Sequence, residues 1–292
     1  MDIVFVVLHY KTDQDTEACV RSIMEKTDGS YRIVIVDNGS KNGSLERLRG
    51  IYAGDERVTF VETKENLGFA RGLNAGIQCA RERWKPRYVA LLNNDTELLS
   101  PCLVERLDEK YRAFGFSVCG PMIISRDGTA YVNPVRKGLR SREDVQKSIA
   151  RYQKWMKLCD LHLYGLYQRL AGRKKKRAAP PDRNYLADQT DVKLHGACWV
   201  LSEAFFTRFE GLDPSTFLYG EEDILYLHVL DEGLHTLYTP DIVIYHKEDG
   251  ATREALPDTE QRVRFISRHS VDSLNIYLKL LESRERKRPE SE

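Results

Sequence analysis

The sequence lacks the patterns that mark several common classes of cofactor and nucleic-acid binding proteins. The six cysteines are scattered and form no Cys-x-x-Cys pair, so neither a zinc site nor a disulfide framework is indicated. No G-x-x-x-x-G-K-[ST] occurs, and no G-x-G-x-x-G follows the first apolar segment, which disfavours P-loop and dinucleotide-binding proteins. The 45 lysines and arginines nearly balance 44 aspartates and glutamates, so the charge gives no signal for nucleic acid.

Long apolar segments are missing too. The first apolar run, residues 3–8, is far shorter than the roughly 20 residues needed to cross a bilayer, and no other window approaches that length. We see no secretory leader pattern and therefore expect a cytoplasmic protein with reduced cysteines, whose only membrane contact would be peripheral. A chain of 292 residues suffices for one large domain or two small ones.

What the first hundred residues do contain is a regular alternation of apolar and amphipathic segments. Candidate strands cover residues 3–8, 32–36, 58–61 and 88–92. Helical patterns lie between them, which predicts an α/β fold with a parallel sheet and right-handed crossovers. Ligands of such sheets bind at the carboxyl ends of the strands. The residues expected at or just beyond those ends include His9, Asp37, Asn66 and Asp95.

The strand at 88–92 ends in Asn93, Asn94 and Asp95. Hard divalent cations prefer oxygen ligands of this kind, so the segment is a candidate metal site. A simple polar turn explains the same residues, and this segment alone leaves both readings open.

Three glycines, Gly68, Gly72 and Gly76, are spaced four residues apart. Gly68 directly precedes a helix predicted at 69–77, and the other two lie within it. Each costs about 1 kcal/mol relative to alanine inside a helix, so something must approach the backbone closely. Tight packing of the helix on the sheet and a bound nucleotide diphosphate near the helix N-terminus are both compatible with the spacing.

The second half carries an acidic cluster, Glu221, Glu222 and Asp223, at the start of a predicted helix that ends near Gly233. Capping of the helix dipole is the simpler explanation, and paired carboxylates for acid-base chemistry are the other. Crowded carboxylates repel, which can raise one pKa toward neutral pH. Further on, His246 follows the strand-like residues 242–245, where it has either a structural or a metal-binding role.

Four segments, in order, resemble family 2 glycosyltransferases of the GT-A fold. They are VDNGS at 36–40, NLGFARGLN at 66–74, LLNNDT at 91–96, and GACWVL at 196–201 followed by the acidic cluster. The resemblance covers roughly residues 3–255 and is most similar to the rhamnosyltransferase-like branch. It implies a mixed central sheet with a Rossmann-like nucleotide-binding half. It also implies inverting transfer of a sugar, L-rhamnose from a dTDP-sugar or a hexose from a UDP-sugar, during cell-surface polysaccharide synthesis.

The resemblance also implies roles for individual residues. Glu222 takes the position of the general base, Glu221 would bind the acceptor or orient the base, and Asp223 is the reserve candidate. Asp95, His246 and Asn93 would hold Mn²⁺ or Mg²⁺, although Asn93 stands where the family usually has aspartate. Contacts to the nucleotide-sugar are implied for His9, Tyr10, Asp37, Asn38, Asn66, Arg71, Asn74, Asn93, Asn94, Lys247 and Arg253.

We expect one GT-A domain over residues 1–257, with a donor-binding half at 1–120 and an acceptor half at 121–257. A helical insertion at about 138–190 interrupts the acceptor half, and a helix predicted at 258–282 begins a C-terminal segment that closes with a charged tail. Apolar residues from Val145 to Leu170 repeat at alternating spacings of four and three, which predicts one long helix with a seam, bent near Gly165.

Three partners for that seam stay open. It could pack on its own domain, on a second subunit in a homodimer, or, helped by the basic run at 173–177, on an anionic membrane surface. The acceptor implied by the resemblance is a glycan or a polyprenyl-diphosphate-linked glycan.

Two other functions remain in view. A sugar nucleotidyltransferase would share the nucleotide-binding sheet, but it normally has a glycine-rich basic loop after the first strand, which residues 9–13 lack. A non-catalytic sugar-nucleotide-binding or scaffold protein would explain Asn93 and Glu222 in place of the usual aspartates.

Overall fold

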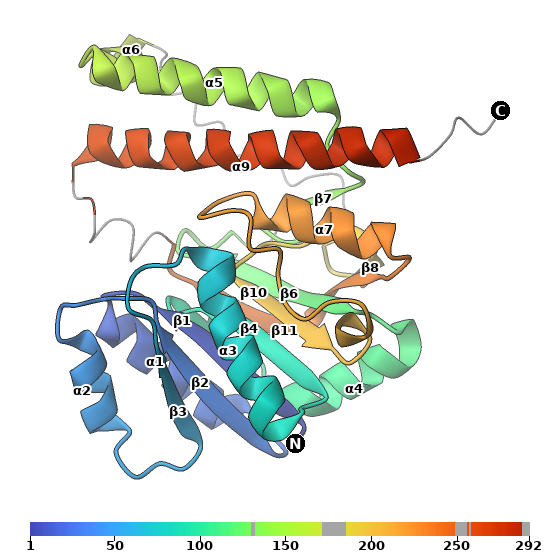
Figure 1. Ribbon diagram of the computed structural model, residues 1–292. Helices are drawn as coiled ribbons and strands as arrows, with labels where there is room; N and C mark the ends of the chain where they lie inside the picture. Colours follow the sequence, from blue (N-terminus) through green and yellow to red (C-terminus); the bar gives the residue numbers. More distant parts are fainter. Residues whose placement is uncertain (130–131, 171–184, 249–255, 257, 288–292) are drawn as a thin grey trace.

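The computed structural model describes residues 1–129, 132–170, 185–248, 256 and 258–287, and all structural statements concern these residues (Figure 1). Its main sheet has the strand order β3-β2-β1-β4-β10-β6-β11-β5, with β8 pairing to β11. The strands are β1 (Ile3–His9), β2 (Tyr31–Asp37), β3 (Val58–Glu62), β4 (Tyr88–Asn93), β5 (Thr96–Leu98), β6 (Val118–Ser125), β8 (Gln189–Thr190), β10 (Cys198–Ser202) and β11 (Thr236–His246). A separate two-stranded ribbon pairs β7 (Arg136–Lys137) with β9 (Val192–Lys193).

The sheet is mixed, as the resemblance to family 2 glycosyltransferases implies, rather than all parallel, as the alternation of segments alone predicts. β1 pairs in parallel with β2 and β4, and β2 pairs in parallel with β3. β10 is antiparallel to both β4 and β6. β1, β2 and β4 are buried on both faces over most of their length because helices cover both faces of this half of the sheet.

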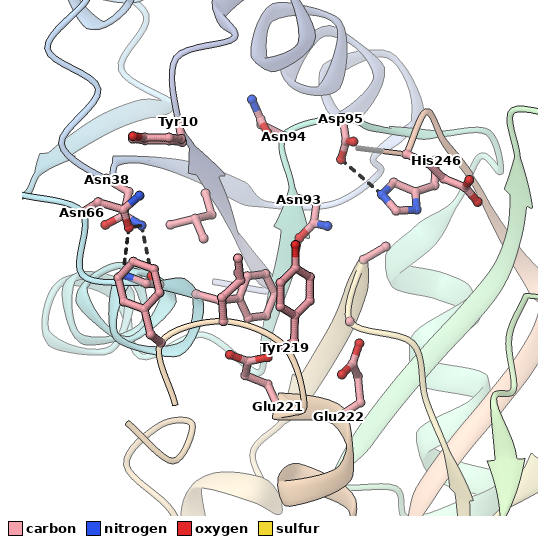
Figure 2. Close-up of a pocket in the computed structure, with 18 of the residues that line it drawn as sticks. Tyr10, Asn38, Asn66, Asn93, Asn94, Asp95, Tyr219, Glu221, Glu222 and His246 are labelled. Atoms are coloured by element: carbon pink, nitrogen blue, oxygen red, sulfur yellow. Dashed lines mark hydrogen bonds and ion pairs between the residues drawn. The ribbon is translucent and has the colours of Figure 1, made fainter. Parts of the chain in front are cut away.

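Two apolar layers lie on the two faces of the sheet. One layer packs the sheet against α1 (Asp13–Lys26), α2 (Ser44–Ile51) and α4 (Leu103–Phe114). The other packs it against α3 (Phe69–Trp84), the short 3-10 helix η1 (Phe205–Thr207) and α7 (Glu221–Asp231). The α/β architecture expected from the alternation is therefore confirmed, and it places the carboxyl ends of β1, β2 and β4 beside the start of α7 (Figures 1 and 2).

The glycines of α3 serve packing inside the protein. A Cβ at Gly76 would lie 2.3 Å from Cγ1 of Val6, and one at Gly72 would lie 2.7 Å from Cδ1 of Leu8. Gly68 has a φ of +85°, and a Cβ there would lie 2.2 Å from the carbonyl oxygen of Phe217. Of the two explanations for the glycine spacing, close packing on β1 and on the chain before α7 accounts for all three positions.

The predicted long seam helix is two helices, and the break is not at Gly165. α5 (Arg142–Asp160) and α6 (Tyr164–Leu170) are separated at residues 161–163, where His162 has a φ of +54°. α5 runs along α9 (Thr259–Lys287), which is longer than the predicted helix at 258–282 (Figure 1). Val145 of α5, Leu274 and Tyr277 of α9, and Leu227 of α7 share one apolar cluster. The first half of the seam therefore packs on its own chain.

Other differences are local. The strand expected at 242–245 is part of β11, which begins at Thr236. The basic run at 173–177 and Arg253 lie outside the described residues. Among the helices that are described, none has the length and apolar character needed to span a membrane.

Candidate functional site

A cavity of about 710 Å³ opens at the carboxyl ends of β1 and β4 (Figure 2). Its opposite wall is the segment leading into α7. The predicted residues that line it are Tyr10, Asn38, Asn66, Asn93, Asn94, Asp95, Glu221, Glu222 and His246. The structure thus brings together residues that lie more than 230 positions apart in the sequence.

The remaining predicted site residues that the structure describes do not line this cavity. Arg71 donates to the carbonyl oxygen of Pro214 at 2.8 Å. The side chain of Asn74 donates to the carbonyl oxygen of Leu212 and accepts from its N–H. Lys247 forms an ion pair with Asp15 at 2.5 Å. Arg71 and Asn74 therefore bind the loop before α7, and Lys247 binds α1.

His9 and Asp37 are buried and do not line the cavity. The His9 ring is fully buried, with its nitrogens 2.7 Å from Oγ1 of Thr16 and 2.8 Å from Oγ of Ser44. Burial lowers the pKa of His9, opposed by the charge of Asp37, whose Oδ1 lies 3.7 Å away. Asp37 accepts a hydrogen bond from the N–H of Ser40. The pair fixes the ends of β1 and β2 rather than facing the open space.

One corner of the cavity is built from Asn38 and Asn66 (Figure 2). The Asn38 amide donates to Oδ1 of Asn66 at 3.1 Å and to the carbonyl oxygen of Gly68 at 3.0 Å. Its own oxygen accepts the N–H of Leu67 at 2.9 Å. These bonds fix the loop that precedes α3, so the corner is rigid before any ligand arrives.

Asp95 and His246 meet at another corner. Oδ1 of Asp95 lies 3.2 Å from Nε2 of His246, and both side chains are about nine-tenths buried. Nδ1 of His246 has no hydrogen-bond partner among the described residues. The N–H of Lys247 donates to the carbonyl oxygen of Asp95, which holds the end of β11 against the loop after β4.

These two groups fit a shared divalent cation. Octahedral Mg²⁺ has ligands at about 2.1 Å, which places neighbouring ligand atoms about 3 Å apart. The 3.2 Å separation matches that spacing, and a carboxylate with an imidazole suits Mn²⁺ equally. No cluster of three or more candidate protein ligands is found among the described residues, so a bound cation would need oxygens from its substrate and from water. Asn94, by contrast, donates to Thr12 and Thr16 and is occupied.

The three adjacent carboxylates have three different environments. Glu221 is buried and accepts the hydroxyl hydrogen of Thr216 at 3.0 Å. Burial, and then the neighbouring charge of Glu222, raise the pKa of Glu221 to about 7. Asp223 points elsewhere, with Lys193 at 2.8 Å and Arg140 at 3.4 Å.

Glu222 is the carboxylate that faces the cavity while remaining partly exposed. A Cβ at Gly196 would lie 3.1 Å from its Oε1, so the glycine before β10 leaves room for this side chain. In Figure 2, Glu221 and Glu222 lie on the wall opposite Asn93 and Asp95.

The residues that line the cavity but were not among the predicted site residues include His195 and Tyr219. Nδ1 of His195 accepts the N–H of Ala197 at 3.1 Å, which leaves the proton of the neutral ring on Nε2. Burial lowers the pKa of His195, opposed by the charge of Glu222, and its ring centroid lies 5.7 Å from that of His246. A histidine directly before the Gly196 motif was the available signal.

Tyr219 stands at a sharp turn into α7. Its φ is +68° and that of Gly220 is +88°, so two successive residues are left-handed, a conformation that a tyrosine rarely adopts. The turn directs the phenol ring into the cavity, toward Asn93 (Figure 2). Sequence patterns do not reveal which residue before a glycine takes such a φ.

Comparisons with known proteins agree with this geometry. Residues 4–172, more than half of the chain, match the family described as Glycosyl transferase family 2. A hexosyltransferase of low-salt glycan biosynthesis, Agl10 of Haloferax volcanii, is 24% identical over 221 residues, which are 76% of this chain and 59% of that protein. The putative teichuronic acid biosynthesis glycosyltransferase TuaG of Bacillus subtilis is 30% identical over 47% of this chain and 51% of its own length. The chain thus spans little more than half of either relative.

Solved structures show the same fold. GalNAc-T7, crystallised with UDP, GalNAc and Mn²⁺, superposes with a TM-score of 0.56 at 15% identity, over 86% of this chain and 44% of its own. TarS of S. aureus, crystallised with UDP, superposes with a TM-score of 0.52 at 11% identity, over 91% of this chain and 65% of its own. The mixed sheet is therefore that of GT-A glycosyltransferases. From the family match and the fold together, we conclude that the chain belongs to glycosyl transferase family 2.

Proposed function

We propose that this protein transfers a hexose from a nucleotide-diphosphate sugar to a hydroxyl of a cell-surface glycan or its lipid-linked precursor, with inversion at the anomeric carbon. The observation that carries the proposal is the position of Glu222 across one cavity from the Asp95–His246 pair. A base and a site for a leaving diphosphate on opposite walls are what a single in-line displacement requires.

Glu222 is proposed as the general base. Its carboxylate would take the proton of the acceptor hydroxyl as that oxygen attacks the anomeric carbon and the bond to the nucleoside diphosphate breaks. A positioned base contributes roughly 10²–10⁴-fold to the rate. Glu221, with its pKa raised to about 7 by burial, would be partly protonated at neutral pH and could donate to the acceptor or to Glu222. Asp223 is paired with Lys193 and is not proposed as the base.

Asp95 and His246 would hold Mn²⁺ or Mg²⁺, with Asn93 beside them as a weaker ligand. The cation would neutralise the charge of the departing diphosphate. Tyr10, Asn38 and Asn66 line the end of the cavity away from Glu222 and are proposed to receive the nucleoside (Figure 2). GalNAc-T7 and TarS were solved with UDP, which supports a UDP-sugar, while a dTDP-sugar such as dTDP-rhamnose remains the alternative suggested by sequence resemblance.

The proposal is tested with three variants of the full chain. Glu222→Gln should lower the transfer rate by at least 100-fold while leaving the affinity for the nucleotide-sugar within twofold. Asp95→Ala should abolish the increase in melting temperature that Mn²⁺ gives in the presence of the nucleotide. Glu109→Gln, an exposed glutamate on α4, is the control and should change neither. Full transferase activity in both Glu222→Gln and Asp95→Ala would overturn the assignment.

We also propose peripheral membrane contact through α6 and the residues just before it. Leu161, Leu166 and Leu170 are 65%, 52% and 77% exposed, and the sequence continues into the basic run at 173–177. Exposed leucines followed in the sequence by basic residues suit an anionic bilayer surface. Co-sedimentation with vesicles containing phosphatidylglycerol should fall when Leu166 and Leu170 are both changed to Ser. Equal binding by this variant would contradict the proposal.

A further inference from the structure

A second, smaller cavity of about 340 Å³ lies behind Glu222, between the β7–β9 ribbon and helices α5, α7 and α9. Tyr219 and Glu222 line both this cavity and the larger one. The two spaces therefore meet at the proposed base. Anything bound in the second cavity would lie next to Glu222 on the side away from Asn38 and Asn66.

The second cavity is strongly basic. Its cationic lining residues are Arg136, Arg140, Arg151 and Lys193, and its anionic ones are Glu222 and Asp223. Four positive charges against two negative leave a formal excess of +2. A net positive cavity of this kind attracts anions and raises their local concentration.

Two of these cations, Lys193 and Arg140, share one carboxylate, that of Asp223. Asp223 accepts from Lys193 at 2.8 Å and from Arg140 at 3.4 Å, and Arg140 also donates to Oγ of Ser148 at 2.6 Å. Arg136 and Arg151 form no ion pair with any residue that the structure describes. Within the described part of the chain, this cavity therefore contains two guanidinium groups that have no carboxylate partner.

Arg151 is held by aromatic rings instead of by an acid. Its guanidinium lies 5.3 Å from the ring centroid of Tyr152 and 5.6 Å from that of Trp155. Cation–π contacts of this kind restrict the position of the guanidinium and leave its positive charge without a counter-charge. The N–H groups stay available, and guanidinium groups bind phosphate oxygens in a bidentate manner.

We infer that this basic cavity binds a phosphate group of the acceptor substrate. The inference rests on the proposed function, which decides on which side of Glu222 the donor and the acceptor bind. The donor's diphosphate is assigned to Asp95 and His246 on one side of Glu222, so an anion on the other side belongs to the molecule whose hydroxyl is activated. The acceptor is then an anionic glycan carrier, either a lipid-linked diphosphate or a chain joined by phosphodiesters.

The binding step can be measured without any turnover. The full chain is saturated with Mg²⁺ and with UDP or dTDP, whichever raises its melting temperature, so that the donor site is filled. Inorganic phosphate is then titrated and followed by ³¹P NMR at low ionic strength. Wild type should bind it, and Arg136→Gln and Arg151→Gln should each weaken binding about tenfold, the loss expected for one charge-assisted hydrogen bond.

Lys147→Gln provides the matched control. Lys147 is an exposed cation on α5 that pairs with Glu143, and it does not line the cavity. Its replacement should leave phosphate binding unchanged. Equal weakening in this control would show that the phosphate is an adventitious ion only, and this result would overturn the inference. The absence of phosphate binding to the wild type would overturn it as well.

Organic probes identify the source of the phosphate. Geranyl diphosphate and a glycerol-phosphate oligomer are compared with inorganic phosphate, and octyl glucoside serves as the uncharged probe. Tighter binding of geranyl diphosphate assigns a lipid-linked acceptor, and tighter binding of the oligomer assigns a phosphodiester chain. If neither exceeds inorganic phosphate, or if octyl glucoside binds equally well, the acceptor assignment is wrong. Failure of the Glu222 and Asp95 variants would leave these binding results unaffected, so the two failures can be told apart.

Discussion

The raised pKa of Glu221 predicts a pH dependence of stability that one substitution should remove. In the unfolded chain this carboxyl titrates near 4.5, whereas burial and the charge of Glu222 raise its pKa to about 7 in the folded protein. The folded state therefore binds the proton more tightly. The contribution of Glu221 to the free energy of unfolding is complete below pH 4.5, falls as the pH rises toward 7, and is constant above that value.

The size of the effect follows from the same values. A pKa difference of one corresponds to about 1.36 kcal/mol, so the rise from 4.5 to about 7 corresponds to about 3 kcal/mol in total. Between pH 5 and pH 8 about 2.5 kcal/mol of this is lost. Glu221→Gln is neutral at every pH and still accepts the hydroxyl hydrogen of Thr216. The variant should therefore gain about 2.5 kcal/mol relative to wild type over that interval.

Urea unfolding at pH 5, 6, 7 and 8 measures this relative gain, because groups that titrate equally in both proteins cancel. Glu222→Gln removes the second cause of the shift and should give an intermediate curve. The exposed Glu109→Gln should follow wild type. Parallel curves for wild type and Glu221→Gln would refute the reasoning, since they would show that Glu221 is ionised in the folded protein throughout this range.

Two further predictions concern packing and buried charge. Gly76→Ala should lower the free energy of unfolding by about 1–3 kcal/mol because the new Cβ would clash with Val6. Gly50→Ala on α2, where a Cβ would meet no other atom within 4 Å, should raise the free energy of unfolding by about 0.5–1 kcal/mol. Urea unfolding of the two variants should therefore show changes of opposite sign. Asp223→Ala should cost about 3–5 kcal/mol because Lys193, with an 11% exposed side chain, loses its counter-charge; a loss below 1 kcal/mol in the same assay would contradict this.

The sheet and its rim could be predicted because local sequence determines them. The candidate strands at 3–8, 32–36, 58–61 and 88–92 agree with β1 to β4 to within one residue at each end, since each is a β-branched or apolar run bounded by polar residues. The same bounds placed Asn93 and Asp95 beside the cavity. Glu222, which lines the cavity, was predicted as a site residue from the family motif rather than from its own chemistry.

The rest depends on contacts between distant segments. β11 begins at Thr236, before Pro240, because a register shift between Thr239 and Val243 lets the strand continue past the proline. Asp223 differs from Glu222 because it binds Lys193 and Arg140, which are 30 and 83 residues away from it in the sequence. No spacing rule predicts those pairings.

Helix α3 has a consequence for how substrates would be received. Through Arg71, Asn74 and the N–H of Phe69 it holds the backbone of residues 212–217, the segment that leads to Tyr219 and Glu221. Ordering one backbone residue costs about 1–2 kcal/mol of conformational entropy. Residues 212–217 are already ordered when the chain folds, so substrate binding does not have to order them. Binding can then proceed with little induced fit on this wall. Loosening α3 from the loop should therefore weaken substrate affinity even though none of these three contacts lies in the reaction path.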